Sequence, residues 1–293
     1  MLARAEPPFA LSVDVEDYYQ VQAFAGRVSR DDWARYPSRV ERNVDRLLDL
    51  FDETSATGTF FVLGWIASRH PELVRRIARR GHEVASHGVT HRMISELTPA
   101  EFRAEAVDSR VMLEDLSGGP VIGFRAPSYS VNRSTLWALE VLRESGYAYD
   151  SSVYPIRRRR YGYPEGPLVP ARIPAGKRDI AEFPLPTIPI GPMRFPVLAG
   201  AYLRLLPSWV SMAAAGYHER GAIPLVVNVH PWEIDPEQPL VGFTRLQKWT
   251  HYARLGSTEG ILRRVLRRGR YAPIATRLRE LGLLEAIAGN GHP

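Results

Sequence analysis

Two histidines four residues apart, His87 and His91, are the residues of this chain whose type and spacing best suit a metal ion. They follow a short apolar run and have Gly88 between them, and two imidazoles at this separation converge on one divalent cation when the segment turns helical. The spacing differs from the zinc-protease motif, in which a glutamate directly follows the first histidine. Taken alone, such a pair is more often two surface histidines of a loop, so its meaning depends on the rest of the chain.

A cluster of acidic residues follows the first apolar segment. Residues 9–15 have the pattern of a buried strand, and Asp14, Glu16 and Asp17 lie at its carboxyl end. Three carboxylates this close repel one another unless a cation or an arginine offsets their charge. Because the chain has eight histidines and no cysteine, a metal site would have to combine imidazole with carboxylate ligands.

Strand and helix patterns alternate along the first 150 residues. Further strands are expected at 58–63, 82–86, 121–124 and 146–150, with helices between them, which is typical of a parallel sheet covered by helices. Arg125 and Asp150 follow two of these strands, and His230 follows a later one at 223–229. In parallel α/β folds the carboxyl ends of the strands are where sites assemble. A metal, a carboxylate base and a distant imidazole acid at such a rim would suit amide hydrolysis.

Size and composition restrict the class of protein further. With 293 residues, 45% of them hydrophobic, the chain can form a large α/β core. It has no apolar run long enough to cross a membrane and begins without a secretory signal pattern, so we expect a cytoplasmic protein without a transmembrane segment. Despite a net charge of +6, no nucleic-acid-binding motif accompanies the arginines, and no nucleic-acid partner is expected. His70 and His82 are predicted to lie on the surface.

Five segments, in this order, resemble the ordered motifs of the polysaccharide deacetylases, the NodB-type carbohydrate esterases of family 4. The later part of the chain is similar to the subgroup found in exosortase-linked exopolysaccharide gene clusters. The resemblance implies a deformed (β/α) barrel at residues 9–235 with a loop-rich insertion at 154–200, followed by a C-terminal helical extension at 236–293 packed on the barrel. The segments that carry it are Ser-Val-Asp-Val-Glu-Asp (12–17), Ser-His-Gly-Val-Thr-His (86–91), Phe-Arg-Ala-Pro-Ser (124–128), the strand that ends at Asp150, and Val-Asn-Val-His-Pro (227–231).

The resemblance also implies an activity, namely removal of N-acetyl groups from an amino-sugar polysaccharide, or from a precursor such as a lipid-linked sugar, by a metal-activated water. Zinc is the expected ion. Asp14 would be the general base, His87 and His91 metal ligands, Arg125 the residue that orients Asp14, and His230 the general acid. Asp150 would pair with Arg125 or His230. Substrate contacts would come from Pro127, from an oxyanion-binding backbone N–H at Ser128 or Tyr129, and from flat rings at Tyr18, Tyr19, Tyr129 and Trp232.

The first motif departs from the usual family pattern of two adjacent aspartates, because Val15 follows Asp14. The third metal ligand must then be Glu16 or Asp17. On an extended segment Glu16 shares a face with Asp14, which favours Glu16, whereas an early turn would favour Asp17. Two alternative functions stay open: a metal-free amidohydrolase of a small cyclic amide or ureide on the same fold, and a catalytically idle carbohydrate- or nucleic-acid-binding protein.

Overall fold

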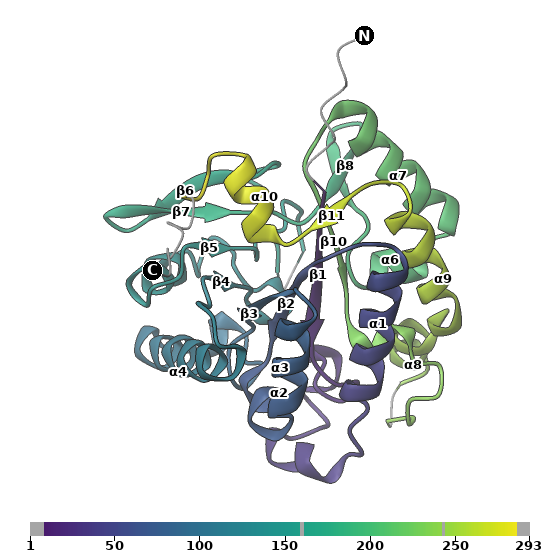
Figure 1. The fold of residues 1–293 in the computed structure, drawn as a ribbon, viewed down its shortest axis with the longest axis horizontal. Helices are drawn as coiled ribbons and strands as arrows, with labels where there is room; N and C mark the ends of the chain where they lie inside the picture. Colours follow the sequence, from purple (N-terminus) through teal and green to yellow (C-terminus); the bar gives the residue numbers. More distant parts are fainter. Residues whose placement is uncertain (1–8, 159–160, 242–243, 286–293) are drawn as a thin grey trace, which may run out of the picture.

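The computed structural model describes residues 9–158, 161–241 and 244–285. Its centre is a nine-stranded sheet with the order β10-β1-β2-β3-β4-β5-β7-β6, and β11 also pairs with β1 (Figure 1). Only β6 and β7 pair antiparallel within it. The strands are β1 (Phe9–Val15), β2 (Thr59–Val62), β3 (Glu83–Ser86), β4 (Gly123–Phe124), β5 (Tyr149–Asp150), β6 (Ala171–Ala175), β7 (Arg178–Glu182), β10 (Leu225–Val229) and β11 (Tyr271–Ala272), with β8 (Thr187–Ile190) and β9 (Met193–Pro196) in a separate hairpin.

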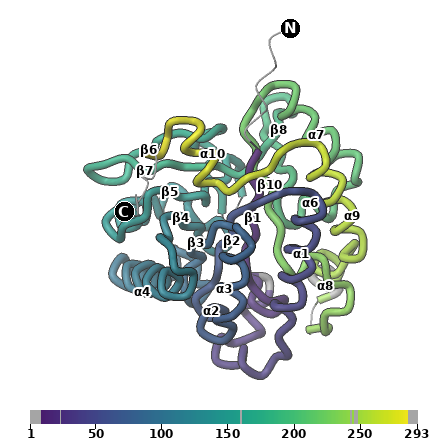
Figure 2. Tube along the Cα trace, in the orientation of Figure 1, coloured from purple at the N-terminus to yellow at the C-terminus, as the bar shows by residue number. Residues whose placement is uncertain are grey.

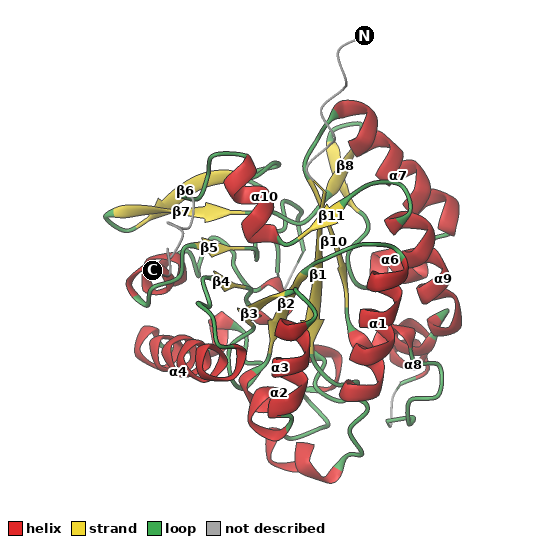
Figure 3. Cartoon of the chain, in the orientation of Figure 1, coloured by secondary structure: helices red, strands yellow, loops and turns green. Residues whose placement is uncertain are grey.

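Helices lie around the central strands, whereas β6 and β7 extend to the edge of the molecule (Figure 3). Helix α4, for example, begins with a capping box between Thr98 and Glu101. It ends at Gly118, whose φ of 71° lets its N–H cap the helix by donating to the carbonyl of Glu114. None of the helices among the described residues is long and apolar enough to cross a membrane. The helices are α1 (Val40–Glu53), α2 (Gly64–Arg69), α3 (Pro71–Arg79), α4 (Pro99–Ser117), α5 (Trp137–Glu144), α6 (Ala201–Leu205), α7 (Ser208–Gly221), α8 (Arg245–Tyr252), α9 (Leu255–Leu266) and α10 (Ile274–Glu280).

The sheet curls into an incomplete barrel, as the family resemblance implied. One interior cluster contains side chains from strands near both edges of the sheet, including Ala10 of β1, Phe61 of β2, Ala181 of β7 and Val226 of β10. A flat sheet could not bring these strands into one cluster. Segments far apart in sequence consequently lie side by side, with β1 between β10 and β2 (Figure 2).

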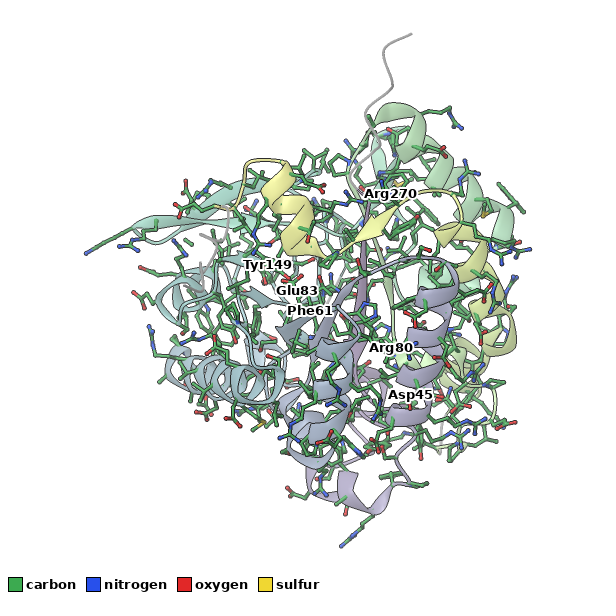
Figure 4. The ribbon with its side chains drawn as sticks, viewed as in Figure 1. Asp45, Phe61, Arg80, Glu83, Tyr149 and Arg270 are labelled. Atoms are coloured by element: carbon green, nitrogen blue, oxygen red, sulfur yellow. The ribbon has the colours of Figure 1, made fainter. Side chains whose placement is uncertain are left out.

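Helix α10 closes the end of the barrel where the strands begin. The backbone N–H of Ile274 donates to Thr59 and that of Ala275 to Glu83, at the starts of β2 and β3. Glu83 also accepts a 3.0 Å hydrogen bond from the Tyr149 hydroxyl inside the sheet (Figure 4). The opposite end, where the strands finish, is left for the polar residues singled out above.

The insertion was expected to be loop-rich and the C-terminal extension to be helical, but both contain β-strands. The insertion forms β6 to β9, and the extension adds β11 to the sheet besides α8, α9 and α10. Sequence analysis missed β11 because two residues carry no periodicity. Residues 159–160 of the insertion and 242–243 and 286–293 of the extension lie outside the described residues. The proposed domain limits remain a prediction.

Candidate functional site

Glu16, His87 and His91 meet at the carboxyl-terminal rim of the barrel. One ligand atom from each of the three lies within 4.8 Å of the others, and all three side chains are buried. Glu16 follows β1, and both histidines follow β3, so the curl of the sheet brings the two segments together. One carboxylate and two imidazoles around one point, with positions left open, form a ligand set that suits zinc and related transition metals.

The surroundings of these residues fit a metal ion. Oε2 of Glu16 lies 2.8 Å from Nε2 of His91, but no described donor satisfies this buried oxygen in hydrogen-bond geometry. Nδ1 of His87 lies 2.8 Å from the carbonyl oxygen of Arg125, which directs the other ring nitrogen into the site, as second-shell partners of metal-bound histidines do. Burial lowers the pKa of His87 to about 4, so its imidazole is neutral and able to bind a cation at neutral pH.

Asp17, the alternative third ligand, points away from the two imidazoles. Its carboxylate accepts hydrogen bonds from the Ser38 hydroxyl and from the backbone N–H groups of Arg39 and Val40, at the start of α1. These contacts give Asp17 a helix-capping role. The geometry therefore favours Glu16 over Asp17 as the carboxylate ligand.

Asp14 lies beside the metal-ligand group and is bound by two residues from other strands. Its Oδ1 accepts a 2.8 Å hydrogen bond from Arg125, and its Oδ2 accepts a 3.1 Å bond from the side-chain amide of Asn228. Burial would raise the pKa of Asp14, but the charge of Arg125 and then those of nearby imidazoles lower it to about 2. The carboxylate is therefore ionised and oriented, as a general base requires.

Arg125 is fully buried and fixed on every side. Besides Asp14, its guanidinium donates to the hydroxyls of Ser12 and Ser151, the carbonyl of Ser151 and the side chain of Asn228. It also lies 4.1 Å from the ring centre of Phe61. Ser12, Ser151 and Asn228 were not identified from the sequence, although Ser12 and Asn228 lie inside the quoted motifs.

Asp150 does not make the contact expected of it. Its carboxylate accepts hydrogen bonds from the hydroxyl and N–H of Ser152, and it lies against Glu182 in the next strand, to which its Cα is paired in register. Among the described residues no hydrogen bond or ion pair joins Asp150 to Arg125 or His230. The expected pairing stays a prediction, and β7 of the insertion instead brings Glu182 alongside Asp150. Burial and the neighbouring Asp150 raise the pKa of Glu182 well above its ordinary value.

His230 completes the group from β10. Its Nε2 lies 3.6 Å from Oδ2 of Asp14 and 3.6 Å from Oε1 of Glu16, and its Nδ1 lies 2.9 Å from Glu233. Burial would lower the pKa of His230, but Glu233, followed by Glu16 and Asp14, raises it to about 9. The carboxylate partner of the imidazole is thus Glu233, three residues further along the chain, a role that sequence analysis did not assign to it.

Three of the four expected aromatic platforms are buried. Tyr18 and Tyr19 are at most 1% exposed, and Tyr19 stacks on Tyr36 at 5.2 Å between ring centres. Trp232 is 7% exposed, and its Nε1 donates a 3.1 Å hydrogen bond to Glu16. Pro127 is also buried. These positions were predicted to contact substrate, but their side chains are buried. Pro127 and Trp232 belong to the 3-10 turns that follow β4 and β10, and Tyr18 and Tyr19 lie in the segment after β1.

A hollow of about 310 Å³ opens beside His230. Ser128 and Tyr129 line it, as expected, and the insertion and α6 contribute Tyr154, Tyr161 and Tyr202, which the sequence did not reveal. A second hollow, of about 550 Å³, lies on the His91 side and is lined by the segment from Tyr19 to Trp33. Both volumes fall within the range of small-molecule pockets.

The backbone beside the tyrosine-lined hollow adopts an uncommon conformation. Ser128 and Tyr129 have φ values of 56° and 52°, and His91 has 54°, in the left-handed region that residues with a side chain rarely occupy. Such conformations concentrate at functional sites, where surrounding contacts hold them. The N–H of Tyr129 donates to the carbonyl of Ala126, so of the two expected oxyanion donors only Ser128 keeps that role as a prediction.

Two family descriptions match consecutive parts of the chain. Residues 31–149 match the family described as Polysaccharide deacetylase, and residues 151–279 match a Domain of unknown function, DUF3473. The first match contains His87, His91 and Arg125 but not Asp14, Glu16 or His230. The boundary between the two matches falls at β5, in the middle of the nine-stranded sheet.

Relatives and solved structures agree with the first family. The chain is 34% identical over 109 residues to a chitooligosaccharide deacetylase of Bradyrhizobium sp., covering 37% of this chain and 47% of that one, and 29% identical over 131 residues to a peptidoglycan deacetylase of Helicobacter pylori, covering 45% and 44%. It thus spans about half the length of these relatives.

Two solved structures resemble the fold over nearly its whole length. A candidate polysaccharide deacetylase from Mycobacterium smegmatis superposes with a TM-score of 0.62 at 21% identity, covering 100% of this chain and 98% of that one. The allantoinase Puue also reaches 0.62, at 14% identity, covering 99% and 96%. At these identities the likeness establishes only the deformed-barrel fold. Any argument about the reaction must come from the residues of the site.

Proposed function

We propose that the chain, whose residues 31–149 match the polysaccharide deacetylase family, is a metal-dependent hydrolase that removes N-acetyl groups from an amino-sugar polysaccharide or its precursor. The exopolysaccharide setting and a lipid-linked form of the substrate are part of this proposal. The cytoplasmic location stays a prediction.

Glu16, His87 and His91 would hold the ion, and zinc is our choice because their ligand types suit it. When bound, such an ion polarises a carbonyl and lowers the pKa of water. Asp14 would accept the proton of the attacking water, with Arg125 and Asn228 fixing its two oxygens. His230 would donate a proton to the departing amine, and Tyr129 and Ser128 would border the sugar.

One observation carries the proposal. An ionised carboxylate, Asp14, and an imidazole, His230, lie 3.6 Å apart next to the three potential ligands. The pKa of the first is lowered and that of the second raised, so one is poised to take a proton and the other to give one at neutral pH. A protein that only binds carbohydrate needs no such pair.

Metal analysis coupled to a substrate panel tests the proposal. Purified protein should contain close to one equivalent of transition metal by elemental analysis, and it should release acetate from chitooligosaccharides or N-acetylated peptidoglycan fragments. A chelator should abolish this release, and adding zinc back should restore it. Allantoin belongs on the same panel because the allantoinase fold matches equally well. Hydrolysis of allantoin by metal-free protein, with no acetate from any glycan, would establish the alternative function.

A further inference from the structure

A buried row of charged side chains runs from His230 away from the reaction centre. Nδ1 of His230 lies 2.9 Å from Oε2 of Glu233, and Oε1 of Glu233 lies 3.3 Å from Nε of Arg204. Arg204 is 1% exposed and Glu233 is fully buried. The remaining guanidinium nitrogens of Arg204 donate to the carbonyls of Thr250 and Ala253, at 3.0 and 2.6 Å. The row therefore ends on helix α8 of the C-terminal extension.

Burying the charges of Glu233 and Arg204 costs desolvation free energy, so a role other than stability would explain why they are buried. A buried ion pair rarely adds stability over apolar residues of similar size. Here the carboxylate of Glu233 accepts the hydrogen of His230 Nδ1 more strongly than a neutral group would. The bond fixes the ring so that Nε2 faces Asp14 and Glu16. Burial raises the pKa of Glu233, but His230 and Arg204 together lower it below its ordinary value, and it stays ionised.

The same segment also supports the carboxylate ligand. Trp232 donates a 3.1 Å hydrogen bond to Oε1 of Glu16, and its ring stacks on that of His251 in α8 at 4.3 Å between centres. Within residues 204–253, Glu233 therefore contacts His230 and Trp232 contacts Glu16. Residues 204–253 all lie in the part of the chain that matches the domain of unknown function.

We infer that Glu233, held in place by Arg204, is the positioning residue for His230, and that the segment from Arg204 to Ala253 is part of the catalytic unit. This inference rests on the proposed function. When the amide C–N bond breaks, its electron pair goes to nitrogen, which must take a proton from Nε2 of His230. Glu233 orients the ring for this transfer and stabilises its protonated form. The resemblance assigned such pairing to Asp150, which lies against Glu182 instead.

Two substrates with different leaving groups test the inference. An N-acetylated chitooligosaccharide expels an amine that needs a proton, whereas 4-nitrophenyl acetate expels a phenolate that does not. We expect E233Q to lower kcat on the chitooligosaccharide by about 100-fold or more, within the range of general acid catalysis, and kcat on the aryl ester by less than about 5-fold. Metal content by elemental analysis should stay at the wild-type level, and thermal melts monitor folding.

Arginine variants and a comparison at Asp150 complete the experiment. R204M should reproduce part of the selective loss on the amide, and R204K, which keeps a cation beside Glu233, should recover much of it. D150N, acting on the other side of the centre, should change both substrates by the same factor. Equal losses on both substrates for E233Q, or no loss on the amide, would overturn the inference alone. Absence of acetate release by the wild type would overturn the proposed function and the inference together.

Discussion

Glu16 and His91 lie with Oε2 and Nε2 only 2.8 Å apart, yet the carboxylate oxygen is left without a hydrogen-bond donor among the described residues. A cation bound by both side chains would satisfy this buried oxygen and the imidazole nitrogen beside it. The neighbouring acid, Asp17, uses its Oδ2 to accept three hydrogen bonds at the start of α1. The two adjacent carboxylates thus have separate tasks, which can be tested separately.

Substituting these two acids should therefore give opposite results. E16Q should lose bound metal and acetate release, because the amide offers no charge to the ion. D17N should keep both, and its free energy of unfolding should fall by about 1 kcal/mol through the weakened cap. Elemental analysis and urea unfolding measure the two effects. Metal retained in E16Q but lost in D17N would reverse the assignment.

Asp14 should matter for the rate but not for metal binding. In D14N the hydrogen bond from Arg125 can persist, but the side chain can no longer take a proton, so kcat should fall about 10²- to 10⁴-fold. Metal content should match that of the wild type, because Asp14 is outside the ligand group. A variant that keeps more than a tenth of wild-type kcat would exclude Asp14 as the base.

The tyrosines that the insertion and α6 contribute to the hollow should affect substrate binding more than the chemical step. Tyr161 and Tyr202 line the hollow beside His230 without touching Asp14 or the ligand group. Y202A should raise KM for a chitooligosaccharide about 2- to 10-fold, the size expected for one aromatic contact, with kcat within about 2-fold. Y217A removes an exposed tyrosine of α7 outside the lining and serves as the control. An unchanged KM in both variants would place the substrate elsewhere.

The pH dependence of stability should contain a contribution from His82. This residue was expected on the surface but is 6% exposed, accepts a hydrogen bond from the Gly58 N–H through Nδ1, and lies 5.0 Å from the ring centre of Phe60. Burial lowers its pKa from 6.5 to about 4. Between these values the unfolded chain binds the proton and the folded chain does not, so the free energy of unfolding falls as pH drops from 6.5 to 4.

Replacing His82 should flatten this dependence. H82N can still accept the hydrogen bond from Gly58. As the pH drops over the same range, the free energy of unfolding should decrease in H82N too, but by a smaller amount than in the wild type; the difference between the two decreases should be at most about 3 kcal/mol. Urea unfolding at pH 7, 5.5 and 4.5 measures the difference. H70N, at a partly exposed histidine bonded to Glu41, is the control. Parallel curves for H82N and the wild type would show that His82 is not the titrating group.

The sequence alone determined the order of strands and helices over the first 150 residues and the identity of most of the central residues. Apolar runs ending in Asp14, His87, Arg125 and His230 are local patterns, and the rule that parallel strands share a carboxyl-terminal rim placed all four on one side. The pattern also excluded a disulfide framework and favoured a His and carboxylate site. These conclusions depend on periodicity and composition, which are properties of neighbouring residues.

Partnerships between side chains were decided only by the tertiary structure. Whether Glu16 or Asp17 faces the imidazoles depends on where the backbone turns after β1, and whether Asp150 meets Arg125 depends on the strand β7 that an irregular insertion places beside it. The burial of Tyr18, Tyr19 and Trp232 and the pairing of His230 with Glu233 likewise follow from packing between distant segments. Long-range contacts of this kind cannot be predicted from the spacing of residues along the sequence, because the residues involved come together only when the sheet curls.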